Sequence, residues 1–354
     1  MHILLNWLVL FSVKVKTALI SVSDKSGLVD FASSLHKLGI HLISTDGTAG
    51  LLRENSIPVQ SVSDLTGYSQ MLDDRVKTLH PVIHGGILAL RDKADHMNRL
   101  NEMGIRPIDL VVVNLYPFQK KVSKESVSIG EAVENIDIGG PTLIRAAAKN
   151  YINVGVVVNP ARYKEITEEL SKNACMLSTS TLSKLAVEAF QHTAEYDSVI
   201  YHYFSRKISS VEEFPHFLDI SYIKIQELRY GENPYQRAAF YQEPYIDQAC
   251  ISNSRQLHGK ELSFNNILDL NDALELVKDF EKPTAAVFKH TNPCGVASDV
   301  DIHKAYLRAH KTDAMSAFGS IVALNRRMPP ELAEFMKQFF VEAVVAPGYE
   351  SKAL

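Results

Sequence analysis

The 354-residue chain has little of what several protein classes require. Its three cysteines, Cys175, Cys250 and Cys294, are far apart and odd in number, which fits a reducing compartment better than a disulfide framework. Lys and Arg number 37 against 41 Asp and Glu, a formal net charge of -4, so no basic surplus exists for binding a nucleic-acid backbone. Neither a Walker A segment nor a G-x-G-x-x-G segment is present, so the sequence does not indicate binding of ATP or of a dinucleotide.

The apolar stretch over residues 3–13 is too short for a membrane helix, which needs about 20 residues. It also lacks the preceding Lys or Arg and the small-residue cleavage site of a signal peptide. We interpret residues 1–16 as an N-terminal extension or the product of a misplaced start codon. The protein is expected to be cytoplasmic, with no membrane and no nucleic-acid partner.

A hydrophobic content of 46% and a charged content of 22% are typical of a soluble globular protein, and the length predicts two domains. Strand and helix patterns alternate from Thr17 onward. Strands are predicted over 17–22, 40–44, 108–114 and 152–158, and helices over 28–38, after 45–48, over 142–150 and over 179–206. This order predicts a parallel sheet covered by helices, with a ligand site at the carboxyl ends of the strands.

The segment 205–217 has mixed charge and no clear period, so the domain boundary is placed there. Residues 216–354 then predict a helix over 267–280 and strands over 284–289 and 320–324.

Polar turns follow the predicted strands. The turns Ser23-Asp24-Lys25 and Thr45-Asp46-Gly47-Thr48 combine hydroxyls with helix-initiating N–H groups, which favours a phosphate site, although simple helix capping explains either turn alone. Two cations and a hydroxyl follow in Arg75, Lys77 and Thr78. They could bind a phosphorylated or carbonyl substrate, or they could simply form an exposed basic turn. Asn114 ends a buried strand. Asp137 and Lys149 lie near the two ends of a predicted helix. Each is either a reacting group or a charge that compensates the helix dipole.

Taken together, these residues resemble the family of bifunctional purine-biosynthesis enzymes that join AICAR transformylase to IMP cyclohydrolase. The resemblance covers about residues 17–354 through the strings SVSDKSGL, GTAGLL, RVKTLHP, HGGILA, NLYPF, ENIDIGGPTLIRAAAKN, FQHTAEYD, LRYGENPYQ, SFNNILDLNDAL, FKHTNPCGVA, KTDAMSAFGSIVAL and FVEAVVAPGYE. It implies an α/β fold in which a methylglyoxal-synthase-like parallel-sheet domain (17–210) precedes part of a cytidine-deaminase-like transformylase domain (216–354).

For the first domain the resemblance implies conversion of 5-formamido-imidazole-4-carboxamide ribotide (FAICAR) to IMP and water, without a cofactor. The implied nucleotide-binding positions are Ser23, Asp24, Lys25, Thr45, Asp46, Gly47, Thr48, Arg75, Lys77, Thr78, Val113, Asn114, Asp137 and Ile138. Lys149 falls on the family's proton donor or acceptor, with Lys77, Tyr116 and Asp137 around the reacting centre.

For the second domain the resemblance implies formyl transfer from the co-substrate 10-formyltetrahydrofolate to AICAR, with Lys289 and His290 as the catalytic pair. His290 would take a proton from the AICAR amine and also counts among the AICAR-binding positions, with Arg229, Tyr230, Gly319 and Glu342. No zinc is expected, because Ala297 stands where a P-C-x-x-C pair needs its second cysteine. The resemblance also implies that the intact protein forms a homodimer and takes small-molecule purine nucleotides as substrates.

Two features depart from the family pattern. Asp46 stands where many relatives have glycine, and a carboxylate there opposes an anionic substrate unless it points away. The chain also ends at Leu354, so the transformylase is expected to be inactive as it stands. The alternatives are a lone cyclohydrolase with a remnant of the transferase, a non-catalytic nucleotide-binding sensor and, less favoured, methylglyoxal synthase.

Overall fold

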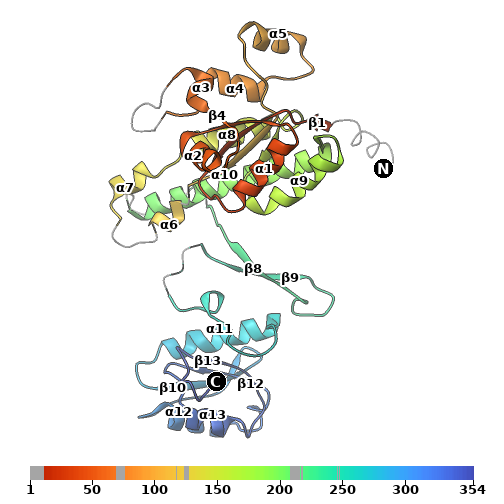
Figure 1. Cartoon of the computed structure of the whole chain (residues 1–354). Helices are drawn as coiled ribbons and strands as arrows, with labels where there is room; N and C mark the ends of the chain where they lie inside the picture. The colour runs from red at the N-terminus through yellow and green to blue at the C-terminus, as the bar shows by residue number, and fades with distance from the viewer. Residues whose placement is uncertain are drawn as a thin grey trace. The chain divides into compact units, whose positions relative to one another are not determined.

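The computed structural model describes residues 12–68, 76–116, 118–122, 127–207, 216, 218–244, 246 and 248–354. The chain divides into two compact units, Met1–Asp219 and Ile220–Leu354. Each unit is built around its own sheet (Figure 1). No helix in these described ranges is long and apolar enough to cross a membrane.

The first unit contains a five-stranded sheet in the order β4-β3-β2-β5-β6, in which all neighbours run parallel. The strands are β2 Thr17–Val22, β3 His41–Ser44, β4 Gln60–Ser61, β5 Leu110–Asn114 and β6 Gly155–Val157. All five residues of β5 are buried, which explains its continuous apolar run. The parallel sheet predicted from the sequence is therefore confirmed.

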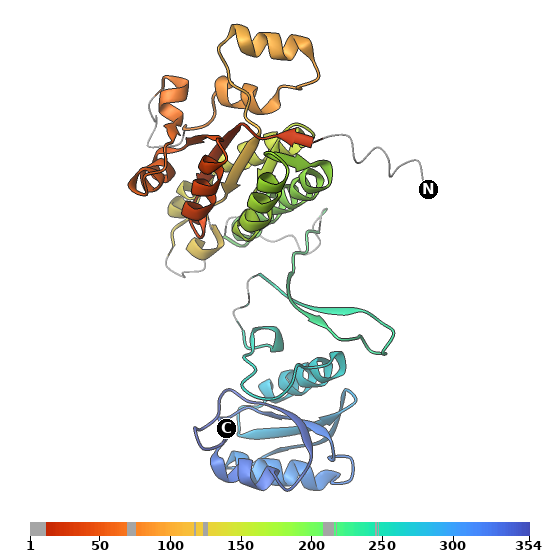
Figure 2. The same cartoon turned by 45° about the vertical axis from the view of Figure 1, so that its right-hand side comes forward.

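Helices cover this sheet and carry its connections. They are α1 Leu28–Lys37, α2 Asp46–Glu54, α3 Val62–Thr66, α4 Pro81–Leu88, α5 Ala94–Glu102, α6 Phe118–Val122, α7 Ile129–Glu134, α8 Gly139–Lys149, α9 Tyr163–Lys172 and α10 Thr179–Lys207, with the 3-10 turn η1 Pro160–Arg162. In both Figure 1 and Figure 2, α1 and α9 lie side by side, and Phe31 of α1 stacks on Tyr163 of α9 with ring centroids 4.3 Å apart. Helix α8 contacts β5 and β6 and packs against α10 and α4.

A short antiparallel pair extends the first unit at its amino end. Strand β1 (Ser12–Lys14) pairs with β7 (Met176–Ser178), and Val13 and Val15 are buried in the core of the unit. Residues 12–16, which the sequence places in the extension, therefore pack with the domain, because β1 pairs with β7 and the side chains of Val13 and Val15 are buried. The predicted strand over 152–158 is also shorter than expected, since Tyr151 to Asn153 form a turn after α8.

The second unit contains a four-stranded sheet in the order β11-β10-β12-β13 and a separate ribbon of β8 and β9. Its elements are β8 Ile223–Leu228, β9 Ala238–Gln242, η2 Ile251–Asn253, α11 Phe264–Lys278, β10 Thr284–Lys289, β11 Asn292–Ser298, α12 Ile302–Thr312, β12 Ser320–Leu324, α13 Pro330–Met336 and β13 Val341–Val345. Within the four-stranded sheet, β12 and β13 run parallel, and the other two pairs are antiparallel. Helix α11 starts three residues before the predicted one, because Ser263 and Asn266 form a capping box.

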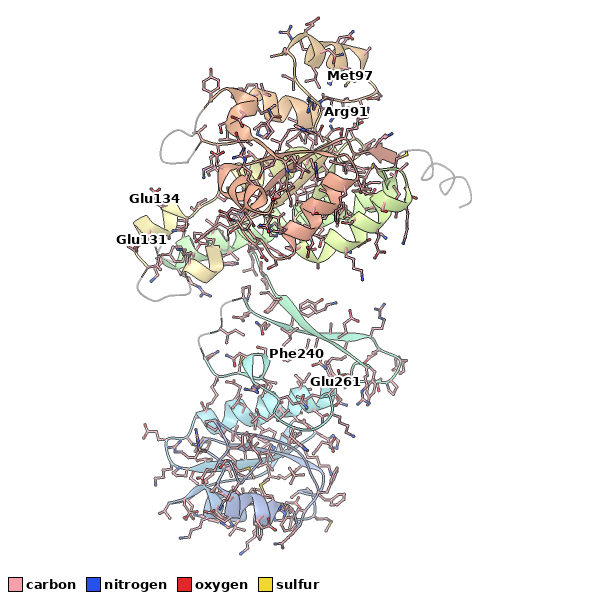
Figure 3. All side chains as sticks on the ribbon, viewed as in Figure 1. Arg91, Met97, Glu131, Glu134, Phe240 and Glu261 are labelled. Atoms are coloured by element: carbon pink, nitrogen blue, oxygen red, sulfur yellow. The ribbon has the colours of Figure 1, made fainter. Side chains whose placement is uncertain are left out.

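Alternation along β10 gives the four-stranded sheet a core on each face. Ala285 and Val287 pack with residues of α12 and α13, whereas Ala286 and Phe288 pack with residues of α11. Phe240 of β9, labelled in Figure 3, is partly buried against the α11 side.

Candidate active site

A cavity of about 650 Å³ opens at the carboxyl ends of β2, β3 and β5. Its lining comprises Ser21, Val22, Ser23, Thr45, Lys77, Thr78, Asn114, Tyr116, Val133, Glu134, Asn135, Ile136, Asp137, Ile138, Gly139 and Gly140. Parallel strands end at the same edge, so turns far apart in sequence meet there. Eight of the sixteen lining residues are positions that the sequence singles out.

The two hydroxyl-bearing turns lie against each other on one side of this cavity. Lys25 Nζ donates a hydrogen bond to the Gly47 carbonyl at 3.1 Å, and the Thr45 hydroxyl donates to Ser21 Oγ at 3.2 Å. Thr45 precedes α2 without a side-chain cap. The start of α2 therefore presents backbone amides beside hydroxyls, an arrangement that suits a phosphate.

Asp46 turns its carboxylate toward α3, where the Ser63 hydroxyl donates to Oδ1 at 3.3 Å. Asp46 is exposed and does not line the cavity. The negative charge that departs from the family pattern is thus engaged outside the cavity.

Asn114 is buried and serves as a brace between strand ends. Its Oδ1 accepts the N–H groups of Ser23 and Asp24 at 2.7 and 2.9 Å, and its Nδ2 donates to the Asp24 carbonyl at 3.0 Å. These bonds fix the turn after β2 against the end of β5. Val113 and Thr48 are buried beneath the site, so their contribution is to shape it.

Asp137 is the best-defined charged group in the cavity. Its Oδ1 accepts the Gly140 N–H at 2.8 Å, and its own N–H donates to the phenol oxygen of Tyr196 at 2.7 Å. Burial raises the pKa of the Asp137 carboxyl, while the Gly140 and Gly139 amides and the positive charge of Lys77 oppose that rise. A carboxylate with a raised pKa beside a cation is suited to proton transfer.

Two glycines allow this carboxylate to lie against the start of α8. A Cβ atom at position 140 would lie 2.5 Å from Asp137 Oδ2 and 2.6 Å from Leu115 Cδ2, and one at position 139 would lie 2.8 Å from Thr78 Oγ1. Helix α8 starts at Gly139, three residues before the predicted start at Thr142, and both glycines belong to its first turn.

We expect Gly140→Ala to lower the rate of the proposed cyclisation at least tenfold, because the new methyl group displaces Asp137. Gly130→Ala in α7 is the matched control, since nothing lies within 4 Å of its Cβ position. Its rate should stay within about twofold of the wild type. Equal rates for the two variants, measured as IMP formation, would contradict the role given to the close approach.

Other predicted positions lie elsewhere. Arg75 is outside the described residues. Lys25 and Asp24 are exposed at the turn after β2, and Asp24 lines a neighbouring hollow instead of the cavity. Lys149 lies in the last turn of α8, ten residues from Gly139, which at 1.5 Å per residue is about 15 Å along the helix. Within one chain the structure does not bring Lys149 together with Lys77, Tyr116 and Asp137.

In the second unit, four predicted residues gather at one edge of the four-stranded sheet. Lys289 ends β10, Gly319 precedes β12, and Glu342 is the second residue of β13. Lys289 Nζ donates to the Phe318 carbonyl at 2.8 Å, and the Gly319 N–H donates to the Phe340 carbonyl at 2.7 Å. His290 follows at the tip of the β10–β11 hairpin.

Arg229 and Tyr230 follow β8, where the Arg229 guanidinium lies 5.8 Å from the Tyr230 ring centroid. Within the described part of the chain, no three His, Cys, Asp or Glu side chains gather as ligands for a metal ion.

Comparisons with known proteins bear on both units. The family model of the AICARFT/IMPCHase bienzyme matches residues 147–354, and that of the MGS-like domain matches residues 27–142. The chain belongs to the AICARFT/IMPCHase bienzyme family.

Its relatives include the bifunctional purine biosynthesis proteins PurH of Thermoanaerobacter sp. (strain X514), 52% identical over 338 residues, and of Acetivibrio thermocellus, 49% identical over 340 residues. Each alignment covers 96% of this chain and 66% of the relative, so the chain spans 66% of the length of these curated proteins. The crystal structure of ForH aligns with a TM-score of 0.47 and 31% identity, over 54% of this chain and 99% of that one.

Sequence reasoning missed two residues that contact the predicted site residues. Tyr196 holds the Asp137 backbone, and Asp269 of α11 accepts hydrogen bonds from the hairpin after Lys289. Both residues lie in strings that carry the family resemblance, FQHTAEYD and SFNNILDLNDAL, so the sequence could have indicated that they matter. It could not indicate their hydrogen-bond partners, because each pair joins elements that are distant in the chain.

Proposed function

We propose that the first unit closes the second purine ring, converting FAICAR to IMP and water. The observation that carries the proposal is the cavity in which hydroxyls and helix amides face Lys77 and the half-buried Asp137. Membership of the bienzyme family supports it. The ribotide phosphate would occupy the side formed by Ser23, Thr45 and the start of α2, with the base directed toward Asp137.

The residues present can serve each step of this reaction. The carboxamide nitrogen forms a bond to the formyl carbon while the Asp137 carboxylate takes one of its protons. Lys77 lies beside the alkoxide that develops on the formyl oxygen and stabilises it. The proton held by Asp137 passes to the alkoxide, and the resulting hydroxyl leaves with the formamide N–H proton as water while a C=N bond forms. Holding the two groups at bonding distance supplies much of the rate.

The test is whether the purified protein converts FAICAR to IMP in the absence of folate. The absorbance of IMP measures the reaction. IMP formation supports the proposal. Tight nucleotide binding without any IMP would overturn it in favour of the non-catalytic sensor, which needs the phosphate turns but not Lys77 and Asp137 as a pair.

Lys149 provides a second test, because the family resemblance implies a role at the reacting centre, whereas the residue is the last one of α8. We expect Lys149→Ala to bind IMP within about twofold of the wild type, since the side chain lies at the far end of α8. Lys77→Ala, in the cavity, should weaken binding at least tenfold. Isothermal titration measures both, and equal weakening would contradict this placement.

The turnover of Lys149→Ala then decides whether that residue takes part. Lost turnover with intact binding means that a second copy of the chain supplies the lysine, and mixing this variant with an Asp137 variant should restore activity. Unchanged turnover removes Lys149 from the mechanism.

We propose further that the second unit contributes the catalytic pair for formyl transfer from 10-formyltetrahydrofolate to AICAR. His290 would accept a proton from the AICAR amine as its nitrogen bonds to the formyl carbon, and the bond to the folate nitrogen breaks to release tetrahydrofolate. Lys289 would stabilise the charge on the formyl oxygen. A homodimer in the cytosol belongs to the same proposal, and light scattering after size-exclusion chromatography tests the dimer.

A further inference from the structure

The hairpin between β10 and β11 holds two non-glycine residues in left-handed backbone conformation. Lys289 pairs with Asn292, which leaves a loop of only His290 and Thr291. Their φ angles are 55° and 60°. Two-residue hairpins of this kind favour Asn-Gly, and a β-branched residue such as threonine is strained there.

Asp269 of α11 supports this loop with both carboxylate oxygens. Oδ1 accepts the Thr291 N–H at 2.7 Å, and Oδ2 accepts the His290 N–H at 3.2 Å. A third bond within the hairpin runs from Asn292 Nδ2 to the His290 carbonyl at 2.8 Å. An ionised acceptor makes stronger hydrogen bonds than a neutral one, so Asp269 offsets part of the backbone strain.

The loop conformation sets where the histidine points relative to the neighbouring lysine. Lys289 reaches the Phe318 carbonyl beside Gly319, whose own φ of 71° turns the chain into β12. Because Lys289 is held in β10, a change of φ at His290 redirects the His290 side chain relative to Lys289. Asp269 itself touches the backbone of the loop and belongs to a different element, α11.

We propose that Asp269 is a positioning residue that holds the His290-Thr291 loop in its left-handed conformation and so sets the orientation of His290 relative to Lys289 at the transfer site. The catalytic consequence rests on the proposed formyl transfer. The conformational role stands on the hydrogen bonds and dihedral angles alone.

Amide hydrogen exchange of Thr291, measured by NMR in the whole chain, tests the conformational role. Asp269→Ala should accelerate exchange of this amide at least tenfold, because its acceptor is lost. Asp279→Ala, an exposed carboxylate just after the same helix, is the control and should leave the rate unchanged. Equal Thr291 exchange in the two variants would overturn the proposal.

A double-variant cycle tests the strain directly. Glycine adopts positive φ without penalty, so Thr291→Gly should reduce the fall in melting temperature caused by Asp269→Ala to less than half. It also provides a folded background if Asp269→Ala alone fails to fold. An undiminished fall in the Thr291→Gly background would mean that Asp269 acts elsewhere, and would overturn the proposal.

Formyl transfer to AICAR provides the functional readout. Asp269→Ala should lower kcat at least tenfold with the AICAR KM within about twofold, and added Thr291→Gly should restore part of kcat. An unchanged kcat in an active chain overturns the positioning role. If the wild-type chain transfers no formyl group, the proposed transfer fails, and the exchange and melting experiments still decide the role of Asp269.

Discussion

Asp137→Asn should lower the rate of IMP formation from FAICAR by at least about 100-fold, the effect typical of a lost general base. The substitution preserves size, and the asparagine oxygen still accepts the Gly140 N–H that now fixes the carboxylate at 2.8 Å. The anchor from the Asp137 N–H to Tyr196 is also unaffected, because it uses the backbone. The lost rate therefore reports proton transfer and not a rearranged helix start.

Asp95→Asn, at an exposed position in the first turn of α5, is the matched control and should keep the wild-type rate. Similar rates for the two variants, measured with saturating FAICAR, would remove Asp137 from the chemistry. The anchoring role of Asp137 would then be the one that remains.

The pH profile adds an independent readout for Asp137. Burial raises the pKa of its carboxyl, so as a base it becomes protonated, and the rate falls, at a higher pH than for an ordinary aspartate. The positive charge of Lys77 opposes this rise. In Lys77→Gln the acidic limb of the residual rate should therefore move to higher pH, and a limb that stays in place would contradict the coupling.

Arg91→Ala should lower the free energy of unfolding of the first unit by about 3 kcal/mol, the cost of leaving a largely buried charge without its partner. Arg91, labelled in Figure 3, precedes α5 and donates to the Ala89, Gly86 and Ile108 carbonyls at 2.7, 2.9 and 3.0 Å. Its Nη2 also lies 3.8 Å from Asp109 Oδ1. Asp109 Oδ2 in turn accepts the backbone N–H groups of Lys16 and Thr17 at 2.9 and 3.1 Å.

This network joins the start of β2, the start of β5 and the segment after α4 at the edge opposite the cavity. Its loss should lower the melting temperature of the first unit by about 6–12 °C in calorimetry. Arg99→Ala, which removes an exposed ion pair with Glu102 on α5, is the control and should change stability by less than about 1 kcal/mol. Equal melting temperatures for the two variants would contradict the network's contribution.

The cost of Arg91→Ala should also depend on pH. Burial raises the pKa of Asp109 in the folded protein, and loss of the Arg91 charge raises it further. The folded state of the variant then binds a proton more readily than the unfolded state, so its stability rises as pH falls through that pKa. The difference from the wild type should therefore shrink in acid.

Local patterns were sufficient to predict the frame of the first unit. The apolar run ending at Asn114 and the turns after Val22 and Ser44 identified three strand ends, and parallel strands place such ends at a common edge. The cavity lies at that edge, as predicted. The sequence predicts that Gly139 and Gly140 open a helix over 142–150, and in the structure both glycines already belong to its first turn. Only the tertiary structure shows their close contact with Asp137 and Thr78, which leaves no room for side chains there.

By itself the sequence determined the family, the order of elements and half of the residues around the cavity, because these depend on composition, short-range periodicity and motif strings. Only the tertiary structure separated Lys149 from Asp137, since the helix between them is rigid and spans about 15 Å. Only it paired Tyr196 with Asp137, 59 residues away, and Asp269 with Thr291. Such contacts depend on how elements pack, and no local pattern specifies which helix lies against which turn.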